Sequence, residues 1–204
     1  MKPEWIARQS AHPTGLIGHV VARVMARDTA RANARVLALL APRSGERVLE
    51  VGCGHGRTLQ EVARRVAPGL AAGVDPSAVM RSVARRDNRA GIAAGTVEIE
   101  DGHSGALPYP AGSFDKVFSV HTLYFWPSLE HGLREIRRVL RAGGTLLLAF
   151  HDGADPGVSA RLPSSVYCLR SACEVEAALR DAQLSKPATQ IDPETGLCIA
   201  TARG

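Results

Sequence analysis

The sequence lacks most of the features that mark membrane-spanning, secreted or metal-binding proteins. No apolar run in its 204 residues approaches the roughly 18–20 residues that a membrane-spanning helix needs. The opening residues Met1–Trp5 contain no apolar signal-peptide core. Four cysteines occur without a C-x-x-C pair or another metal-ligand spacing, although Cys168 and Cys173, five positions apart, leave a redox or metalloid-binding pair as an alternative to ordinary thiols. We therefore expect a soluble, cytoplasmic protein that binds no metal.

Lysine is also scarce, and arginine carries almost all of the positive charge. The net charge is +5 and the isoelectric point about 9.4, a balance that can favour nucleic acid, acidic lipid or an anionic substrate. However, no basic tract is interleaved with aromatic residues, and the arginines occur along presumed helices in pairs, namely Arg64-Arg65, Arg85-Arg86 and Arg137-Arg138. This distribution is typical of solvated helix faces. We expect no nucleic-acid partner, and peripheral contact with a membrane stays an alternative.

The stretch from Arg47 to Arg57 is the most informative part of the chain. Its short apolar run predicts a strand buried on both faces, and the run ends in glycines at positions 52, 54 and 56. From Arg57 onward the apolar residues follow helical spacing, with Leu59, Val62 and Val66 on one side. Strand, glycine turn and helix begin a βαβ unit, whose turn lets a ligand come close to the backbone.

The details of this turn narrow the choice of ligand. A dinucleotide fingerprint would place its third glycine at position 57, where this chain has arginine. Glu50 would repel a pyrophosphate but would suit a ligand with an amine. The pattern acidic-x-Gly-x-Gly-x-Gly resembles the first motif of class I S-adenosylmethionine (AdoMet)-dependent methyltransferases, whose cofactor carries an amine, a carboxylate and no phosphate.

Acidic residues end the next two predicted strands. Asp75 closes the strand 70–75 about 20 residues past the glycine turn, where such an acid can accept both ribose hydroxyl protons; the alternative is that it caps the next helix, 77–89, in which Met80 points inward. Asp101 closes the strand 97–102. In the family that Glu50 and the glycines resemble, this second position holds the adenine amine, and Gly102 leaves room for the ring.

The second half of the core strengthens the resemblance. Residues 106–115 are similar to the family segment L-P-[FY]-x-x-x-x-F-D and lead into a strand at 116–120. A helix at 127–140, a strand at 145–150, a loop at 151–164, a helix at 172–183 and strands at 186–191 and 196–202 follow. The count predicts an α/β, Rossmann-like, doubly wound sheet of seven strands, mostly parallel with the last antiparallel.

The hydrophobic content of 45% is enough for one well-buried domain. We divide it into an N-terminal helical extension, residues 1–45, and a methyltransferase domain, residues 46–204. Apolar residues at helical spacing predict helices over 16–25 and 36–40. The extension either packs on the sheet edge or closes over the ligand pocket, and Trp5, Gln9 and His12 favour a lid formed by residues 1–18.

The resemblance implies AdoMet as cofactor, S-adenosylhomocysteine as product and a small-molecule methyl acceptor. It implies a set of cofactor-binding residues at the strand ends and on the helix after the second strand, namely Glu50, Gly52, Cys53, Gly54, Gly56, Asp75, Pro76, Met80, Asp101, Gly102, His103, Ser119 and His121. Methyl transfer is an in-line displacement that needs a base only when the acceptor still carries a proton. His121 is the first candidate for that base and Tyr124 the second, each with an alternative role in shaping the pocket.

Missing motifs exclude several acceptors. No Asn/Asp-Pro-Pro-Tyr/Phe ends the fourth strand, no paired-glutamate hairpin follows it, and the acidic cluster of metal-dependent enzymes is not evident. Nucleobase amines, protein arginine and catechols are therefore disfavoured, whereas quinone, lipid-headgroup, natural-product and metalloid acceptors stay open. A non-catalytic AdoMet-binding module and an NAD-dependent oxidoreductase are the alternatives from other classes.

Overall fold

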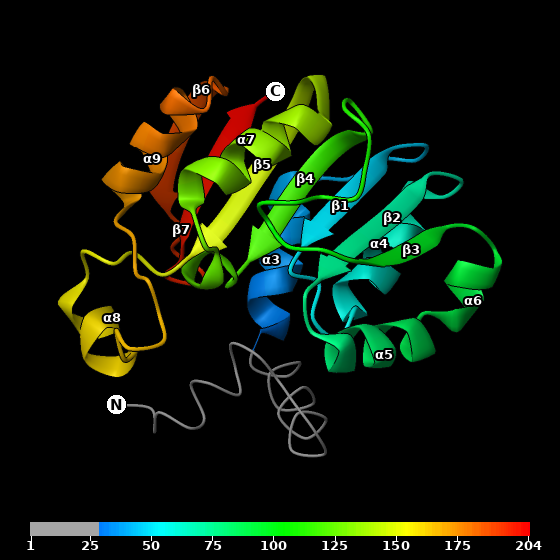
Figure 1. Ribbon diagram of the computed structural model, residues 1–204, viewed down its shortest axis with the longest axis horizontal. Helices are drawn as coiled ribbons and strands as arrows, with labels where there is room; N and C mark the ends of the chain where they lie inside the picture. Colours follow the sequence, from blue (N-terminus) through cyan, green and yellow to red (C-terminus); the bar gives the residue numbers. More distant parts are fainter. Residues whose placement is uncertain (1–28) are drawn as a thin grey trace.

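A computed structural model describes residues 29–204, which form one seven-stranded sheet flanked by helices (Figure 1). The strands are β1 Arg47–Val51, β2 Leu70–Asp75, β3 Val97–Asp101, β4 Phe114–Val120, β5 Leu140–Phe150, β6 Ser185–Ile191 and β7 Cys198–Arg203. The helices are α3 Ala30–Leu40, α4 Arg57–Val66, α5 Ala78–Asp87, α6 Arg89–Ala93, the 3-10 turn η1 Leu123–Phe125, α7 Leu129–Val139, α8 Pro156–Arg161 and α9 Ala172–Asp181.

The strand order is β3-β2-β1-β4-β5-β7-β6, with β1 pairing in parallel to β2 on one side and to β4 on the other. Only β7 runs against its neighbours, pairing antiparallel to both β5 and β6. The predicted fold class is therefore confirmed. The chain turns from one half of the sheet to the other between β1 and β4, and ligands of open α/β sheets bind outside the strand ends at such a switch point.

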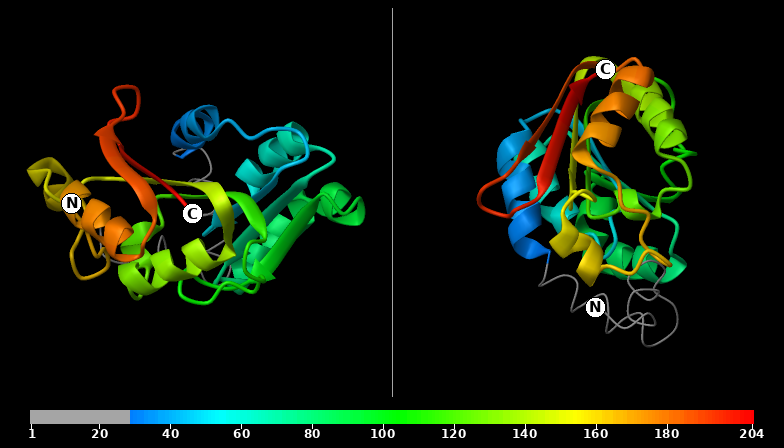
Figure 2. Two further views of the ribbon diagram at one scale, coloured as in Figure 1. Left: turned by 90° about the horizontal axis from the view of Figure 1, so that it is seen from above. Right: turned by 90° about the vertical axis from the view of Figure 1, so that its left-hand side faces the viewer.

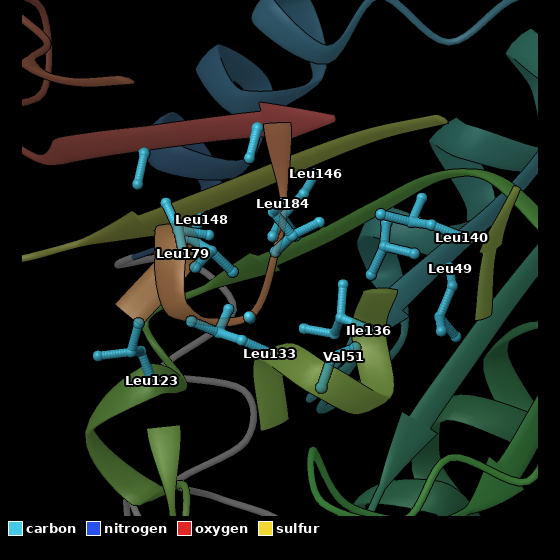
Figure 3. Packing of buried hydrophobic residues seen from close by; sticks show 14 of the residues in the cluster. Leu49, Val51, Leu123, Leu133, Ile136, Leu140, Leu146, Leu148, Leu179 and Leu184 are labelled. Atoms are coloured by element: carbon cyan, nitrogen blue, oxygen red, sulfur yellow. The ribbon is translucent and has the colours of Figure 1, made fainter. Parts of the chain in front are cut away.

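Each face of the sheet is covered by its own helices. In Figure 2, α3 and α4 lie on one side of the sheet and α7 and α9 on the other. Alternate residues of one strand serve the two cores: Leu146 and Leu148 of β5 join the cluster under α7 and α9, whereas Leu147 joins the cluster under α3 and α4. Figure 3 shows the first cluster, where Leu133 and Ile136 of α7 point toward the sheet. A strand buried on both faces must be apolar throughout, as the sequence predicted.

Several element boundaries differ from the predictions, and three of the differences have a local cause in the structure. The predicted helix 77–89 is present as α5 but ends at Asp87, and the short helix α6 follows it. Between the two, the buried Asn88 side chain donates hydrogen bonds to the carbonyls of Gly56 (3.0 Å) and Ala84 (2.9 Å). Strand β5 begins at Leu140 rather than 145, since Leu140 already pairs with Phe114. The predicted loop 151–164 contains the short helix α8, which Asp155 caps by accepting a hydrogen bond from the Gly157 N–H.

The predicted N-terminal helix 16–25 and the proposed lid, residues 1–18, lie outside the described residues. The second predicted helix is present as α3, which ends at Leu40 just before Pro42. Within residues 29–204, no helix has both the length and the apolarity that crossing a bilayer requires.

Candidate functional site

A pocket lies at the switch point, where β1, β2 and β4 end side by side (Figure 1). Residues from β1, the glycine turn and α4 form its floor, namely Glu50, Val51, Gly52, Cys53, Gly54, His55 and Thr58. The ends of β2 and β3 and the start of α5 contribute Asp75, Pro76, Met80, Gly102, His103 and Ser104. The far wall follows β4 and includes Val120, His121, Thr122, Phe125, Trp126 and Pro127, while Thr29 and Asn33 reach the rim from α3.

Only one of the three glycines in the turn faces open space. A Cβ on Gly54 would meet nothing within 4 Å, whereas a Cβ on Gly52 would lie 2.4 Å from Cγ2 of Thr122. A Cβ on Gly56 would lie 2.8 Å from the Cβ of Ala84 on α5. The motif thus has two packing glycines and one, Gly54, whose missing side chain leaves the pocket open for a ligand.

The Asp75 carboxylate fixes the turn from the neighbouring strand. One of its oxygens accepts a hydrogen bond from the Gly54 N–H at 2.9 Å, and the other accepts one from the Ser77 N–H, also at 2.9 Å. Ser77 rather than Asp75 caps α5, because its hydroxyl accepts the Met80 N–H. Asp75 therefore orders two loops of the pocket at once.

Two buried polar atoms in the pocket have no hydrogen-bond partner in the described part of the chain. Among the described residues, Oε2 of Glu50 and Oγ of Ser104 are buried without a hydrogen bond, and both residues line this pocket. An unpaired buried polar group is costly and calls for an explanation. A ligand with an amine near the glycine turn and a polar base edge near the β3 end would satisfy both atoms. AdoMet carries both groups, so the donor set of the pocket fits it.

The electrostatics of the pocket floor centre on Glu50. Burial, followed by the neighbouring Asp75 carboxylate, raises the pKa of Glu50 well above its usual value, against a smaller opposing effect of a hydrogen bond with Thr58. Burial likewise raises the pKa of the Cys53 thiol, with Glu50 as the next cause. Cys53 therefore stays protonated and is no nucleophile. Burial, helped by Arg57, lowers the pKa of His55, which keeps this imidazole neutral.

Four of the predicted site residues do not line the pocket. The Asp101 side chain is largely exposed and pairs with Arg81 (2.9 Å). Gly56 packs on α5, as described above. Ser119 is buried, with its hydroxyl hydrogen-bonded to that of Thr122. Tyr124 is buried too, and its hydroxyl accepts the backbone N–H of His151. Burial raises the pKa of Tyr124, which disfavours its use as a base at neutral pH.

Sequence reasoning missed several residues of the pocket. Thr122 orders the pocket wall that follows β4. Its hydroxyl accepts a hydrogen bond from the Trp126 indole N–H at 3.2 Å and donates one to the Val51 carbonyl at 3.3 Å. Ser104 sits in a tight turn in which the Ala106 N–H donates to the His103 carbonyl. No motif signalled these residues, whose positions depend on side-chain packing. For Thr122, the sequence shows only that it directly follows His121 at the end of the fourth strand.

The segment 106–115, which is similar to a family motif, is held against α7 by hydrogen bonds. Arg138 donates hydrogen bonds to the carbonyls of Tyr109 (2.7 Å) and Leu107 (3.0 Å), and the Leu107 N–H donates to Glu135 at 3.1 Å. The hydrogen bond from Arg138 lowers the pKa of Glu135 to about 2. This ion pair holds the loop that follows the Gly102–Ser104 wall of the pocket.

His121 has an unusual backbone conformation at the end of β4. Its φ of 58° is left-handed, which costs a residue other than glycine roughly 1–2 kcal/mol. Such strain persists only where the surrounding structure enforces it, and it concentrates at functional sites. Here the His121 N–H donates to the Ala149 carbonyl at 2.9 Å, and the residue lines the pocket.

The cysteines and basic residues show no second site. Cys168 and Cys173 are both exposed and free. Within the described part of the chain, no three His, Cys, Asp or Glu residues are grouped as a metal site would need. Most of the paired arginines are exposed in the last turns of α4, α5 and α7, as their spacing predicted. Arg138 is the exception, because it is partly buried and binds the carbonyls of Leu107 and Tyr109.

Comparison with known proteins points to one family. Residues 49–148 match a family model described as a methyltransferase domain. The chain is 39% identical over 104 residues to the fatty-acid O-methyltransferase of Mycolicibacterium smegmatis, a match that covers 50% of this chain and 36% of that protein. It is 36% identical over 114 residues to the nocamycin O-methyltransferase of Saccharothrix syringae, covering 55% and 40% respectively. The chain therefore spans less than half the length of these two curated relatives.

A solved structure supports the fold over the whole chain. The SAM-dependent methyltransferase from Aquifex aeolicus superposes with a TM-score of 0.70 at 19% identity, covering 100% of this chain and 98% of that one.

Proposed function

We propose that this protein, whose residues 49–148 belong to the class I AdoMet-dependent methyltransferase family, transfers a methyl group from AdoMet to an oxygen atom of a small-molecule acceptor. The observation that carries the proposal is the unpartnered carboxylate oxygen of Glu50, buried beside the open face of Gly54 at the switch point of the sheet. A phosphate-bearing dinucleotide would be repelled there, whereas the ammonium group of AdoMet would supply the missing donor.

The cofactor then lies along the strand ends. Glu50 and the backbone around Gly54 would hold the methionyl group, and the Asp75 carboxylate would accept the ribose hydroxyls. Met80 and the Gly102–Ser104 turn would hold the adenine. We assign a base-edge hydrogen bond to Ser104 because its hydroxyl is buried without a partner. Pro76, Cys53 and His103 complete the wall by contact. The role predicted for Asp101 stays a prediction, and it requires this carboxylate to leave Arg81.

When bound, AdoMet supplies an electrophilic methyl group on a sulfonium. The chain has to orient the acceptor oxygen in line with that group and exclude water, and orientation alone is worth roughly 7–11 kcal/mol at the extreme. Val120, Phe125 and Trp126 give the β4 side of the pocket an apolar wall, and the indole of Trp126 is fixed by Thr122. His121, on the same wall, removes the acceptor proton where there is one.

The acceptor class comes from the two curated relatives, whose names specify O-methylation of a fatty acid and of nocamycin. Both names fit an acceptor that is small and partly apolar, and the aromatic residues behind β4 would suit such a molecule. The open wall around His121 and Phe125 favours catalysis over a non-catalytic AdoMet-binding module, which needs no space beside the methyl group.

The first experiment measures binding, and the second measures transfer. Calorimetry should show binding of AdoMet and S-adenosylhomocysteine and no binding of NAD. Radiolabelled methyl from AdoMet should then appear in one class of acceptor from a panel of fatty acids, phenols, macrolide alcohols, quinols and lipid headgroups. Absence of AdoMet binding would overturn the proposal. Binding without transfer to any member of the panel or to a metabolite extract would favour the non-catalytic module.

A further inference from the structure

Two histidines end neighbouring strands and face each other. His121 follows β4 and His151 follows β5, and their imidazole rings are 5.2 Å apart between centroids with an angle of 38° between the planes. The strand ends are tied together, since the His121 N–H donates to the carbonyl of Ala149. The His151 N–H donates to the hydroxyl of the buried Tyr124. The backbone of both histidines is therefore fixed by hydrogen bonds.

The two rings separate two hollows of the protein. His121 lines the AdoMet pocket, and His151 lines a second cavity of about 560 Å³ between the end of β5, helix α8 and the β6–β7 turn. Arg161 and Ile191, on opposite sides of this second cavity, are exposed. The second cavity is therefore open to solvent. The imidazole pair lies between these two hollows.

We propose that His151 is a positioning residue through which His121 passes the acceptor proton to solvent, and that the acceptor is consequently a hydroxyl compound. The inference rests on the proposed function and narrows its substrate class. In the step, the acceptor O–H bond breaks and its proton goes to a ring nitrogen of His121. The electron pair left on oxygen forms the bond to the methyl carbon as the methyl–sulfur bond breaks, and the electrons of that bond stay on the sulfur of the leaving S-adenosylhomocysteine. The proton then moves to His151, directly or through one water, and leaves as a protonated buffer or hydronium ion.

Whether such a proton path is needed depends on the chemistry of the acceptor. A carboxylic acid is already ionised at neutral pH, so its methylation releases no proton inside the pocket. A phenol or alcohol keeps its proton until attack, so that proton has to leave the base before the next turnover. Cofactor and acceptor together would cover the pocket side of His121. A second imidazole beside the other cavity would give the proton a separate way to solvent and return His121 to its neutral form.

The surroundings allow the pair to carry one proton. On the pocket side, the titratable residues Glu50, Asp75, His55 and His103 line the same pocket as His121. On the cavity side, Asp152, Asp155 and Arg161 share the wall with His151. Carboxylates on both sides favour one positive charge on the pair. A second charge is disfavoured by repulsion between the rings, so the two histidines should titrate as a coupled unit.

Proton sharing can be tested without AdoMet or an acceptor. The ring C–H signals of the seven histidines are followed by NMR over pH in the full chain, with His121→Phe and His151→Phe used for assignment and perturbation. We expect the His121 signal to follow a two-step curve that becomes a single step in His151→Phe, and the reverse for His151 in His121→Phe. A single-step His121 curve that is the same in wild type and in His151→Phe would overturn the proposal.

Turnover gives a second, independent readout. With the hydroxyl acceptor found in the panel, His151→Phe should lower kcat by about 100-fold, a typical contribution of acid–base catalysis, while KM and the Kd for AdoMet change by less than about twofold. Phenylalanine keeps the ring contact, so a merely structural role predicts near-normal kcat for His151→Phe. Added imidazole should rescue His151→Ala, whose vacated space opens on the second cavity, but not His151→Phe.

The outcomes separate the two proposals. A wild-type protein that neither binds AdoMet nor transfers methyl overturns the proposed function. A wild-type protein that methylates only carboxylates, or a His151→Phe variant with normal kcat toward a hydroxyl, leaves the proposed function intact and overturns this inference.

Discussion

Replacing Glu50 by glutamine should change ligand binding and stability in opposite directions. Glu50 is 4% exposed, and its Oε2 has no hydrogen-bond partner among residues 29–204. In Glu50→Gln the shape is kept while the charge is lost. A hydrogen bond to a charged group is worth roughly 1.5–3 kcal/mol, so the Kd for AdoMet should rise by about 10- to 150-fold. The ligand-free variant should be at least as stable as wild type near pH 7, because it no longer buries an unpaired carboxylate.

The pH dependence of both quantities follows from the raised pKa of Glu50. Burial, and then the Asp75 carboxylate, raise this pKa above the unfolded value of 4.5. The folded protein therefore binds more protons than the unfolded chain above that pH. The contribution of Glu50 to stability is fully present below pH 4.5 and is lost as the pH rises through the raised folded value. Across the same window AdoMet should bind more tightly, since its ammonium group favours the ionised carboxylate.

Two measurements on one pair of variants test this reasoning. Urea unfolding of the ligand-free protein and calorimetric titration with AdoMet are each run between pH 5 and 8. The variant-minus-wild-type stability should increase with pH, and the AdoMet Kd of Glu50→Gln should depend less on pH than that of wild type. Glu98→Gln, on the exposed face of β3, should change neither quantity. Unaltered AdoMet affinity in Glu50→Gln, or identical pH slopes of stability in the two proteins, would refute the assignment.

Three further predictions concern the rest of the site. Gly54→Ala should abolish most AdoMet binding. The control Gly112→Ala, at a left-handed glycine that also has open space around it, should bind AdoMet normally. Equal AdoMet affinities of the two variants in calorimetry would refute the role of Gly54. Asp75→Ala should weaken AdoMet binding by roughly 1–3 kcal/mol in a folded protein, which circular dichroism and calorimetry together can check. Deleting residues 1–14 should reduce turnover and AdoMet affinity, because Trp5, Gln9 and His12 favour a lid in the sequence. AdoMet should also slow proteolysis near Ala11–Gly15. Full activity of the truncated protein would contradict the lid.

The features that follow from chain order could be predicted from the sequence. The seven strands, their parallel core and the antiparallel last strand are set by hydrophobic runs and crossovers, which leave few topologies. Because parallel strands end at the same edge, the position of Asp75 next to the glycine turn followed from the strand boundaries alone. Its hydrogen bond to the Gly54 N–H is a consequence of the register in which Val51 pairs with Val74.

Features that depend on side-chain partners could not be predicted in this way. Asp101 ends β3 as expected, yet Arg81 on α5 draws its carboxylate outward. Tyr124 was a candidate base by position, yet its hydroxyl is occupied by the N–H of His151, a residue 27 positions away in sequence. Ser104 carries no recognisable motif, and its importance appears only because the fold buries its hydroxyl without a partner. The sequence therefore predicts which strand end carries a side chain, whereas its hydrogen-bond partners and burial depend on neighbours that are distant in sequence.

The glycine turn combines both kinds of information in one motif. All three glycines match the family pattern, so the sequence treats them as equal. In the fold, Gly52 allows Thr122 to approach, Gly56 allows α5 to approach, and only Gly54 leaves space for a ligand. Substitution of Gly52 or Gly56 would lower AdoMet binding by displacing Thr122 or α5, and that loss would say nothing about direct contact. Among the three glycines of the turn, a loss of binding therefore reports on the cofactor itself only at Gly54.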